Sequence, residues 1–269
     1  MPLAVCATPI GNLEDVTLRV LRELAEAEVV LCEDTRHTRV LLDRHGIRAR
    51  KLVSYHRHNE ARRTGEVLER LRAGTRIALV SDAGLPAVND PGTRLVSAAL
   101  ETGVSVTVLP GPSAVATALV ASGLASERYQ FVGFLPRAEN ARRALWAELA
   151  RWPYTAVAFE SPKRLPASLT SLASALPDRR VAVCRELTKR FEEVVVGRPE
   201  ELAARFAEPP KGEIALVLGP GEASVEVELG DAVSAVRELV ADGVARRRAV
   251  DLVAALTGLS RNQLYRESL

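Results

Sequence analysis

The sequence lacks features that would assign it to several large classes of protein. Its three cysteines, Cys6, Cys32 and Cys184, form neither a CxxC pair nor a Cys/His cluster, which excludes an obvious disulfide framework or zinc site. No apolar run approaches the roughly 18 residues of a membrane span, and the first residues lack the charged start and long apolar stretch of a secretion signal. We therefore expect a cytoplasmic protein with no membrane segment and no bound metal.

Several nucleotide-binding and catalytic motifs are also missing. No GxGxxG follows the first predicted strand and no GxxxxGK[ST] occurs anywhere, which argues against a dinucleotide site or a P-loop. The histidines are accompanied by no GxSxG elbow and no catalytic-cysteine signature, so a nucleophilic triad is disfavoured.

Lysine is scarce, and the basic charge is unevenly distributed along the chain. The formal net charge is only +2, yet residues 36–63 hold nine Arg or Lys residues against two acids, and they contain all four histidines. Such a run is often only a solvated surface, but it is also the pattern that binds a polyanion.

The chain has the length and hydropathy pattern of two α/β domains followed by helices. With 269 residues and 47% hydrophobic residues it can bury a sizeable core. Short β-branched runs alternate with amphipathic segments, which predicts βα units around mainly parallel or mixed sheets. In a first domain, 1–113, we expect strands at 3–7, 29–32, 51–54, 77–81 and 104–109, with helices that include 18–27 and 61–73. In a second domain, 114–222, we expect a helix at 114–123, strands at 130–133, 155–159, 181–185, 193–196 and 214–218, and helices at 141–150, 165–175 and 200–206. A small appendage, 223–269, follows with helices at 232–241, 249–256 and 262–268.

Polar, glycine-rich segments follow each of the first five predicted strands. In open α/β sheets ligands bind beyond the carboxyl ends of the strands, so these segments meet at one edge. Any one of them could be an ordinary turn, whereas five together favour a binding site. Glycine loops with few fixed cations suit a ligand held by backbone groups with a flat part on apolar side chains, as in adenosyl compounds.

Eight segments carry a specific family resemblance, in order along the chain. They are TPIGNL (8–13), EDTRHT (33–38), SDAGLPAVNDPG (81–92), PGPSA (110–114), GFLPR (133–137), FESPKRL (159–165), RELTK (185–189) and KGE (211–213). The chain resembles the tetrapyrrole-methylase superfamily from residue 3 to about residue 219. Within it, the motifs are similar to those of bacterial enzymes that methylate the ribose 2′-hydroxyl of a cytidine in small-subunit (16S) ribosomal RNA.

The resemblance implies a two-domain enzyme, usually a homodimer, with S-adenosylmethionine (SAM) in the cleft between the domains. The implied substrate is a cytidine in the decoding region of the small-subunit rRNA, in an assembled or late-assembling 30S subunit. Carried over position by position, the implied cofactor contacts are Pro9, Ser81, Asp82, Ala83, Gly84, Leu85, Ser113, Ala114, Phe159, Glu160, Leu187 and Ile214.

Proton transfer and RNA contact have separate candidates. A ribose hydroxyl is a weak acid, so a carboxylate or a cation near it would help methyl transfer; the candidates are Glu33, Asp34, Lys189 and Glu213. Alternatively, Glu33 and Asp34 cap the following helix and Lys189 pairs with Glu186. From the basic stretch after the second and third strands and the arginine run of the tail, the candidate RNA contacts are Arg36, His37, Arg39, Arg57, His58, Arg246, Arg247 and Arg248.

Three alternatives stay open at this point. The last helices fit either a helix-turn-helix that binds nucleic acid or an αα-hairpin used for packing. The activity could be a sister reaction of the superfamily, on a tetrapyrrole or a protein side chain. The protein could also be an RNA-binding factor that keeps the fold without turnover.

Overall fold

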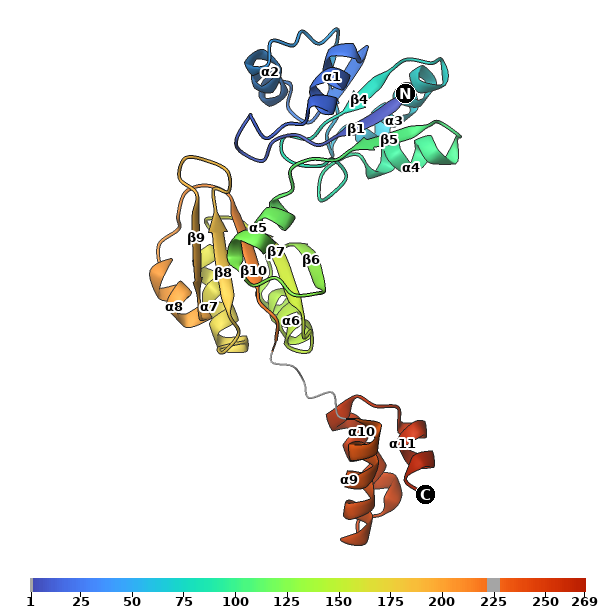
Figure 1. Ribbon diagram of the computed structural model, residues 1–269, viewed down its shortest axis with the longest axis vertical. Helices are drawn as coiled ribbons and strands as arrows, with labels where there is room; N and C mark the ends of the chain where they lie inside the picture. The colour runs from blue at the N-terminus through green and yellow to red at the C-terminus, as the bar shows by residue number, and fades with distance from the viewer. Residues whose placement is uncertain (1, 222–227) are drawn as a thin grey trace.

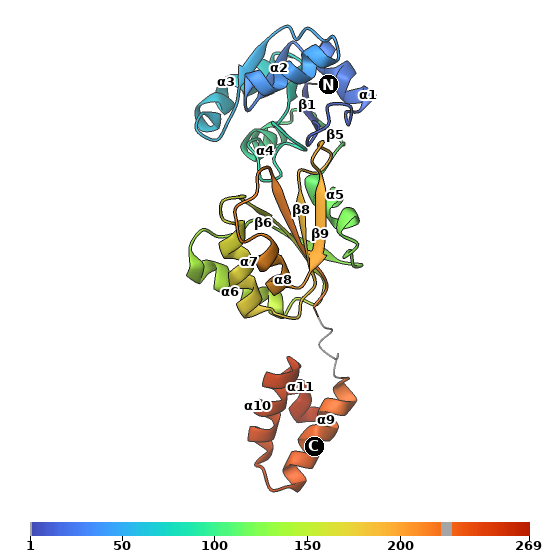
Figure 2. The ribbon, with the colours of Figure 1, turned by 90° about the vertical axis from the view of Figure 1, so that its left-hand side faces the viewer.

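The computed structural model describes residues 2–221 and 228–269. Its elements form two α/β units and a group of three helices, in chain order (Figure 1). In Figures 1 and 2 the three C-terminal helices stand apart from the second unit, beyond the end that lies away from the first unit. Within the described residues, none of the helices has the length and apolar character needed to span a bilayer.

The first unit is a five-stranded parallel sheet in the order β3-β2-β4-β1-β5. Its elements are β1 (Leu3–Cys6), α1 (Leu18–Glu26), β2 (Val29–Cys32), α2 (Thr35–Arg44), β3 (Leu52–Ser54), α3 (Glu60–Arg72), β4 (Ile77–Leu79), α4 (Thr93–Glu101) and β5 (Val106–Leu109). All five predicted strands are present, with ends that differ by up to two residues. Parallel strands need crossover connections, and helices fill them here.

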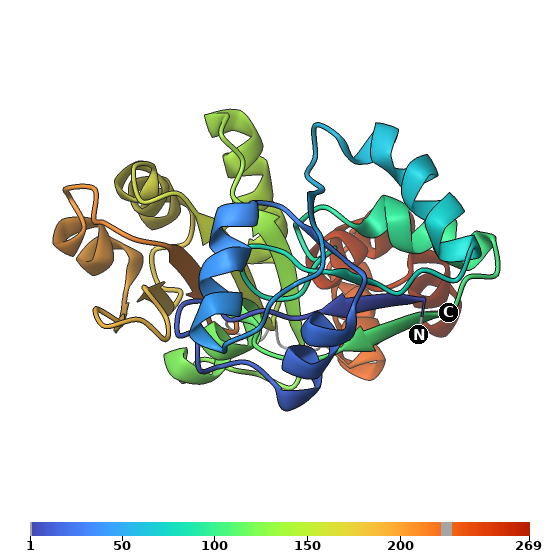
Figure 3. The same ribbon diagram turned by 90° about the horizontal axis from the view of Figure 1, so that it is seen from above.

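Two helical layers cover this sheet, one on each face. Side chains of α3 and α4 pack on one face around Leu3, Leu31 and Leu79, and those of α1 and α2 pack on the other around Ala4 and Val30. Figure 3 shows these layers on opposite sides of the strands. Because alternate residues of a strand point to opposite faces, both faces of these short strands are apolar.

The second unit is a mixed sheet in the order β6-β7-β10-β8-β9. Its elements are α5 (Ala114–Ser122), β6 (Tyr129–Phe134), α6 (Glu139–Ala150), β7 (Thr155–Glu160), α7 (Leu165–Ala175), β8 (Val181–Arg185), β9 (Glu193–Gly197), α8 (Pro199–Arg205) and β10 (Ile214–Leu218). Strand β10 lies in the centre and runs antiparallel to both β7 and β8, whereas β6 and β7 are parallel.

Helix α5 packs on this second sheet rather than on the first. Its buried residues Val115 and Ala118 share a cluster with Val157, Ala182 and Val217 of the second unit. The domain boundary at 113/114 stays a prediction. The boundary predicted at 222/223 lies outside the described residues.

The C-terminal helices α9 (Leu229–Ala241), α10 (Arg246–Thr257) and α11 (Arg261–Glu267) have a core of their own. Ala232, Val236, Ala249, Val253 and Leu264 are buried in it. Two arginines hold the end of the chain against α9 and α10. Arg237 donates a hydrogen bond to the carbonyl of Glu267 at 2.9 Å, and Arg246 donates one to the carbonyl of Ser268. Ser260 stands at the N-cap position of α11, but its side chain makes no capping hydrogen bond.

Candidate functional site

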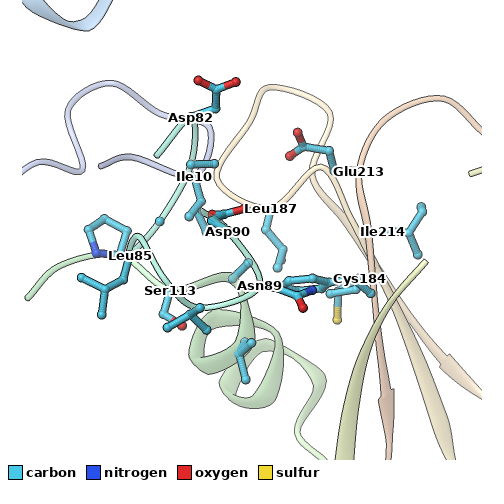
Figure 4. A pocket seen from close by; sticks show the side chains of 18 of the residues that line it. Ile10, Asp82, Leu85, Asn89, Asp90, Ser113, Cys184, Leu187, Glu213 and Ile214 are labelled. Carbon is cyan, nitrogen blue, oxygen red and sulfur yellow. The ribbon is translucent and has the colours of Figure 1, made fainter. Parts of the chain in front are cut away.

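A pocket of about 500 Å³ lies between the two α/β units (Figure 4). The first unit contributes the segments that follow β1, β4 and β5, and the second unit contributes the ends of β7, β8 and β10. The carboxyl ends of parallel strands meet at one edge of a sheet, so three of the five segments predicted from the sequence line this pocket, whereas those after β2 and β3 do not. The volume lies within the range of small-molecule sites.

The pocket wall is mostly apolar and carries acids as its charged groups. Its lining includes the apolar side chains of Ile10, Leu85, Val88, Phe134, Phe159, Leu187 and Ile214 and the carboxyl groups of Asp82, Asp90, Glu160 and Glu213. In the part of the chain that the structure describes, no lysine or arginine belongs to this lining. Such a wall suits a ligand with a flat apolar part and a positive charge, and SAM, with its adenine and sulfonium, fits it.

Hydrogen bonds join the loop after β1 to the loop after β4. The backbone N–H of Thr8 donates to the carbonyl of Gly84 at 2.8 Å, and that of Gly84 donates back at 3.0 Å. The hydroxyl of Ser81 donates to the same carbonyl of Gly84 at 3.2 Å. Gly84 has φ of 77°, and a Cβ there would meet only ordinary contacts, so its backbone conformation rather than crowding requires glycine.

Ten of the twelve expected cofactor residues line this pocket, and Pro9 and Ser81 do not. Pro9 precedes the lining residue Ile10, and Ser81 acts through the loop hydrogen bonds just described. The ten lining residues are Asp82, Ala83, Gly84, Leu85, Ser113, Ala114, Phe159, Glu160, Leu187 and Ile214.

The chain matches the family model described as tetrapyrrole (corrin/porphyrin) methylases over residues 2–203. It belongs to this family.

Curated relatives and solved structures agree with that membership. A relative from Mesorhizobium japonicum named ribosomal RNA small subunit methyltransferase I is 45% identical, over 99% of this chain and 91% of its own. One of the same name from Micromonospora olivasterospora is 46% identical, over 98% of this chain and 85% of its own. The solved structure of a cobalt precorrin-4 methyltransferase superposes with a TM-score of 0.62 at 19% identity, covering 81% of this chain and 94% of that one. A uroporphyrin-III C-methyltransferase from Thermus thermophilus, solved with S-adenosylhomocysteine, gives a TM-score of 0.56 at 24% identity, covering 81% and 96%.

The predicted fold is thereby confirmed, and membership of a methylase family accords with the expected cofactor, SAM. The family model ends at residue 203, but the two named relatives align along nearly the whole chain, helical appendage included.

In this methylase, Glu160 is buried and fully engaged. Its side chain pairs with Arg164 at 2.5 Å and accepts a hydrogen bond from Ser168 at 2.5 Å. Because both carboxylate oxygens already have protein partners, Glu160 shapes the pocket wall.

Lys189 lies beside the pocket and bridges two acids. Its Nζ is 2.8 Å from Glu186 Oε1 and 3.0 Å from Glu213 Oε2. The hydrogen bond from Lys189 holds the pKa of Glu186 below its usual range. Lys189 therefore pairs with Glu186, as one of the two readings of the sequence had it. Among Glu186, Lys189 and Glu213, Glu213 belongs to the pocket lining.

The two units touch where the loop after β1 meets the turn after β8. The N–H of Asn12 donates to Thr188 Oγ1 at 3.1 Å. Next to it, a Cβ on Gly11 would lie 2.9 Å from the carbonyl oxygen of Leu187. Only glycine allows the two backbones to approach this closely.

Asp34 caps α2 and stands apart from the pocket lining. Its Oδ1 accepts the N–H of Arg36 at 2.8 Å, and the Arg36 guanidinium holds the pKa of Asp34 below its usual range. The N–H of Asp34 in turn donates to Asp82 Oδ1 at 3.0 Å. Burial raises the pKa of Glu33, which is also absent from the lining. The capping role left open for Asp34 is thus the one that its contacts show.

Some of the expected RNA-contact residues are exposed, and others have protein partners. Arg39, His58, Arg247 and Arg248 are exposed. Others already have protein partners: Arg36 pairs with Asp34, His37 lies 3.2 Å from Asp82, Arg57 donates to the carbonyl of Asn89, and Arg246 binds the Ser268 carbonyl. Since Arg246 joins α10 to the end of the chain through the Ser268 carbonyl, its contacts indicate a structural role.

Asn89 and Asp90 line the pocket, although neither was among the expected site residues. Both lie in the segment SDAGLPAVNDPG that carries the family resemblance. Their place in the pocket depends on residues from other loops, which this segment alone does not reveal. Burial, together with the neighbouring Glu33 carboxylate, raises the pKa of Asp90 to about 6.

Proposed function

We propose that this methyltransferase transfers a methyl group from SAM to the ribose 2′-hydroxyl of a cytidine in small-subunit rRNA. The observation that carries the proposal is near full-length similarity, at 45–46% identity, to relatives named ribosomal RNA small subunit methyltransferase I. The acidic and apolar pocket supports the choice of methyl donor. The cytidine and its 2′-oxygen come from the motif resemblance.

The proposed SAM site uses backbone groups on one side and apolar side chains on the other. The loop from Ser81 to Leu85 and the start of α5 at Ser113 offer backbone N–H and carbonyl groups. Phe159 and Leu187 offer flat apolar surface for the adenine. When bound, SAM supplies the methyl group, and the walls of two separate units fix its direction, which is where much of the rate can originate.

The proposed RNA surface is the rim formed by residues after β2 and β3. Arg39 and His58 are exposed there, and Arg36 and Arg57 keep exposed guanidinium groups beside their protein partners. Arg247 and Arg248 would extend the contact from the helical appendage. We further propose a cytoplasmic homodimer that acts on an assembled or late-assembling 30S subunit.

Glu213 and Lys189 are proposed to assist at the reacting hydroxyl. Glu213 lines the pocket, its side chain is 73% exposed, and the Lys189 ammonium is 3.0 Å away. Glu33 and Asp34 stay weaker candidates because neither lines the pocket.

A labelling experiment tests the function directly. The protein is incubated with methyl-labelled SAM and small subunits from cells that lack the modification, and the labelled nucleotide is mapped. A 2′-O-methyl linkage resists alkaline hydrolysis because the blocked oxygen cannot attack its phosphate. Label on a base, on a protein or on a tetrapyrrole would refute the proposal, and SAM binding without any transfer would favour a non-catalytic RNA-binding factor.

A further inference from the structure

The mouth of the pocket has two exposed apolar side chains with no role in the proposed SAM site. Val88 from the first unit and Phe134 from the second both line the pocket, and they are 48% and 57% exposed. The Phe134 ring stands edge-on to Phe159, with centroids 5.6 Å apart. A single exposed phenylalanine is ordinary, but here two apolar side chains from different units share one opening.

The segments that carry these two side chains lie close together. A Cβ on Gly133 would lie 3.2 Å from Asn89 Oδ1, so the two segments are close. Val88 precedes Asn89 and Phe134 follows Gly133, so both residues are adjacent in the chain to the point where the two segments approach each other. The mouth of the pocket is therefore bounded by one apolar side chain from each unit.

The loop that carries Val88 is held in an uncommon conformation. Ala87 and Asn89 have φ of 68° and 69°, which residues other than glycine rarely adopt. Arg57 supports the loop by donating to the carbonyl of Asn89 at 2.6 Å. Strained backbone held by a specific contact is typical of functional loops.

Asp90 follows in the same loop and is distinct among the acids of the pocket. Within the described residues it has no ion-pair partner, whereas the other three lining acids are paired: Asp82 with His37, Glu160 with Arg164 and Glu213 with Lys189. Asp90 faces Glu33 after β2, Arg57 after β3 and Asp82 after β4, and its pKa is raised chiefly by burial. A more basic, unpaired carboxylate at the wall of the pocket is suited to accept a proton.

We infer that the target nucleotide enters between Val88 and Phe134, packs its base on the Phe134 ring and places its 2′-hydroxyl against the carboxylate of Asp90. The inference rests on the proposed function. The 2′-oxygen forms a bond to the methyl carbon while the carbon–sulfur bond breaks and its electron pair stays on sulfur. The hydroxyl proton moves to Asp90, so the products are a 2′-O-methyl ribose, S-adenosylhomocysteine and a protonated carboxyl group that releases its proton to water.

Asp90→Asn tests the proton acceptor, because it removes the charge and keeps the shape. The single-turnover rate constant with small subunits should fall by about 10²- to 10⁴-fold. The dissociation constants for SAM and for the subunit should each stay within roughly threefold, as expected for a group that acts only in the reaction. The wild-type rate should fall below about pH 6, where Asp90 takes up a proton, and the variant should lack this limb. Asp178→Asn, at an exposed carboxylate of the second unit, is the matched control.

Phe134→Ala tests the base contact through binding alone. An RNA fragment with an abasic target nucleotide should bind the wild type about 5- to 100-fold more weakly than the intact fragment, the range expected for one stacked base. Phe134→Ala should bind both fragments equally, and Phe134→Trp should restore the difference.

The outcomes separate this inference from the function on which it rests. If the wild type transfers no methyl group to a ribose, the proposed function fails. If it does, but Asp90→Asn retains the rate or loses SAM affinity in proportion, Asp90 is not the acceptor. If Phe134→Ala still distinguishes the abasic fragment, the base lies elsewhere, and either result overturns the inference.

Discussion

Replacing Gly11 with alanine is expected to weaken SAM binding while leaving both units folded. Gly11 lies where the loop after β1 touches the turn after β8, next to two pocket-lining residues that share one buried cluster, Ile10 of the first unit and Leu187 of the second. Its φ is not in the left-handed region, so alanine can adopt the backbone conformation. The whole effect should therefore come from the contact between the units.

The size of the effect follows from the distances at the missing Cβ. That atom would lie 2.5 Å from Lys189 Cγ and 2.7 Å from Thr188 Oγ1, side-chain atoms that can rotate away. The carbonyl oxygen of Leu187, at 2.9 Å, belongs to the backbone and can move only with its turn. Overpacking of this kind costs about 1–3 kcal/mol. The free protein can relieve the strain by separating the two loops, but SAM needs both walls, so its affinity should fall by about 5- to 150-fold.

Calorimetric titration of SAM, together with thermal unfolding, measures this effect. Gly65→Ala is the matched control because Gly65 lies within α3 and a Cβ there would meet nothing within 4 Å. The control should bind SAM normally and gain about 0.5–1 kcal/mol of stability from its helix propensity. Wild-type SAM affinity in a folded Gly11→Ala protein would show that the contact does not set the pocket walls.

Three further predictions concern the loops and the RNA surface. Gly84→Ala should lower SAM affinity by about 1 kcal/mol in free energy, because alanine is strained at φ of 77°; unchanged affinity would mean that the loop can change its conformation at no cost. Asp90→Asn should raise the free energy of unfolding by about 1–2 kcal/mol at pH 8 but not near pH 3.5: a raised folded pKa means that the charged form is disfavoured in the folded state, and this penalty is present above about pH 6 and absent below the unfolded pKa. A double variant, Arg36→Ala with Arg39→Ala, should reduce the slope of log affinity against log salt by about 0.7–0.9 for each phosphate that the protein no longer binds, with unchanged SAM affinity; an unaltered slope would remove these residues from the RNA surface.

The order and type of most elements could be predicted from the sequence, but their pairing could not. The strand at Ile214–Leu218 was predicted with its observed bounds. Its central, antiparallel place was not, because a strand buried on both faces is apolar throughout in either direction. A helix was expected after Glu33 and Asp34, but the bounds of α2 could not be predicted, because its apolar residues Val40, Leu41 and Leu42 are adjacent and mark no clear helical face.

The glycine-rich loops of the site could be predicted from the sequence, but the contacts of its charged side chains could not. The backbone conformation of Gly84 follows from its local sequence. Arg246 binds the carbonyl of Ser268, 22 positions away, and the pKa of Asp90 depends on burial and on Glu33, which lies in another loop. Pairings of that kind arise only when the chain has folded, so a run of arginines does not reveal which of them are already bound to the backbone.

The central place of β10 has a consequence for the order in which the protein is made. Strands β7 and β8 do not pair with each other, because β10 lies between them. The first sheet is complete once Leu109 has left the ribosome, but the second cannot close until Leu218 has done so. During synthesis the emerging chain therefore holds a finished parallel unit next to two unpaired apolar strand edges, which are the edges most prone to aggregate. A stalled chain whose last residue outside the ribosome lies between 186 and 213 should thus need a chaperone, whereas a stalled chain with only its first 113 residues outside should not.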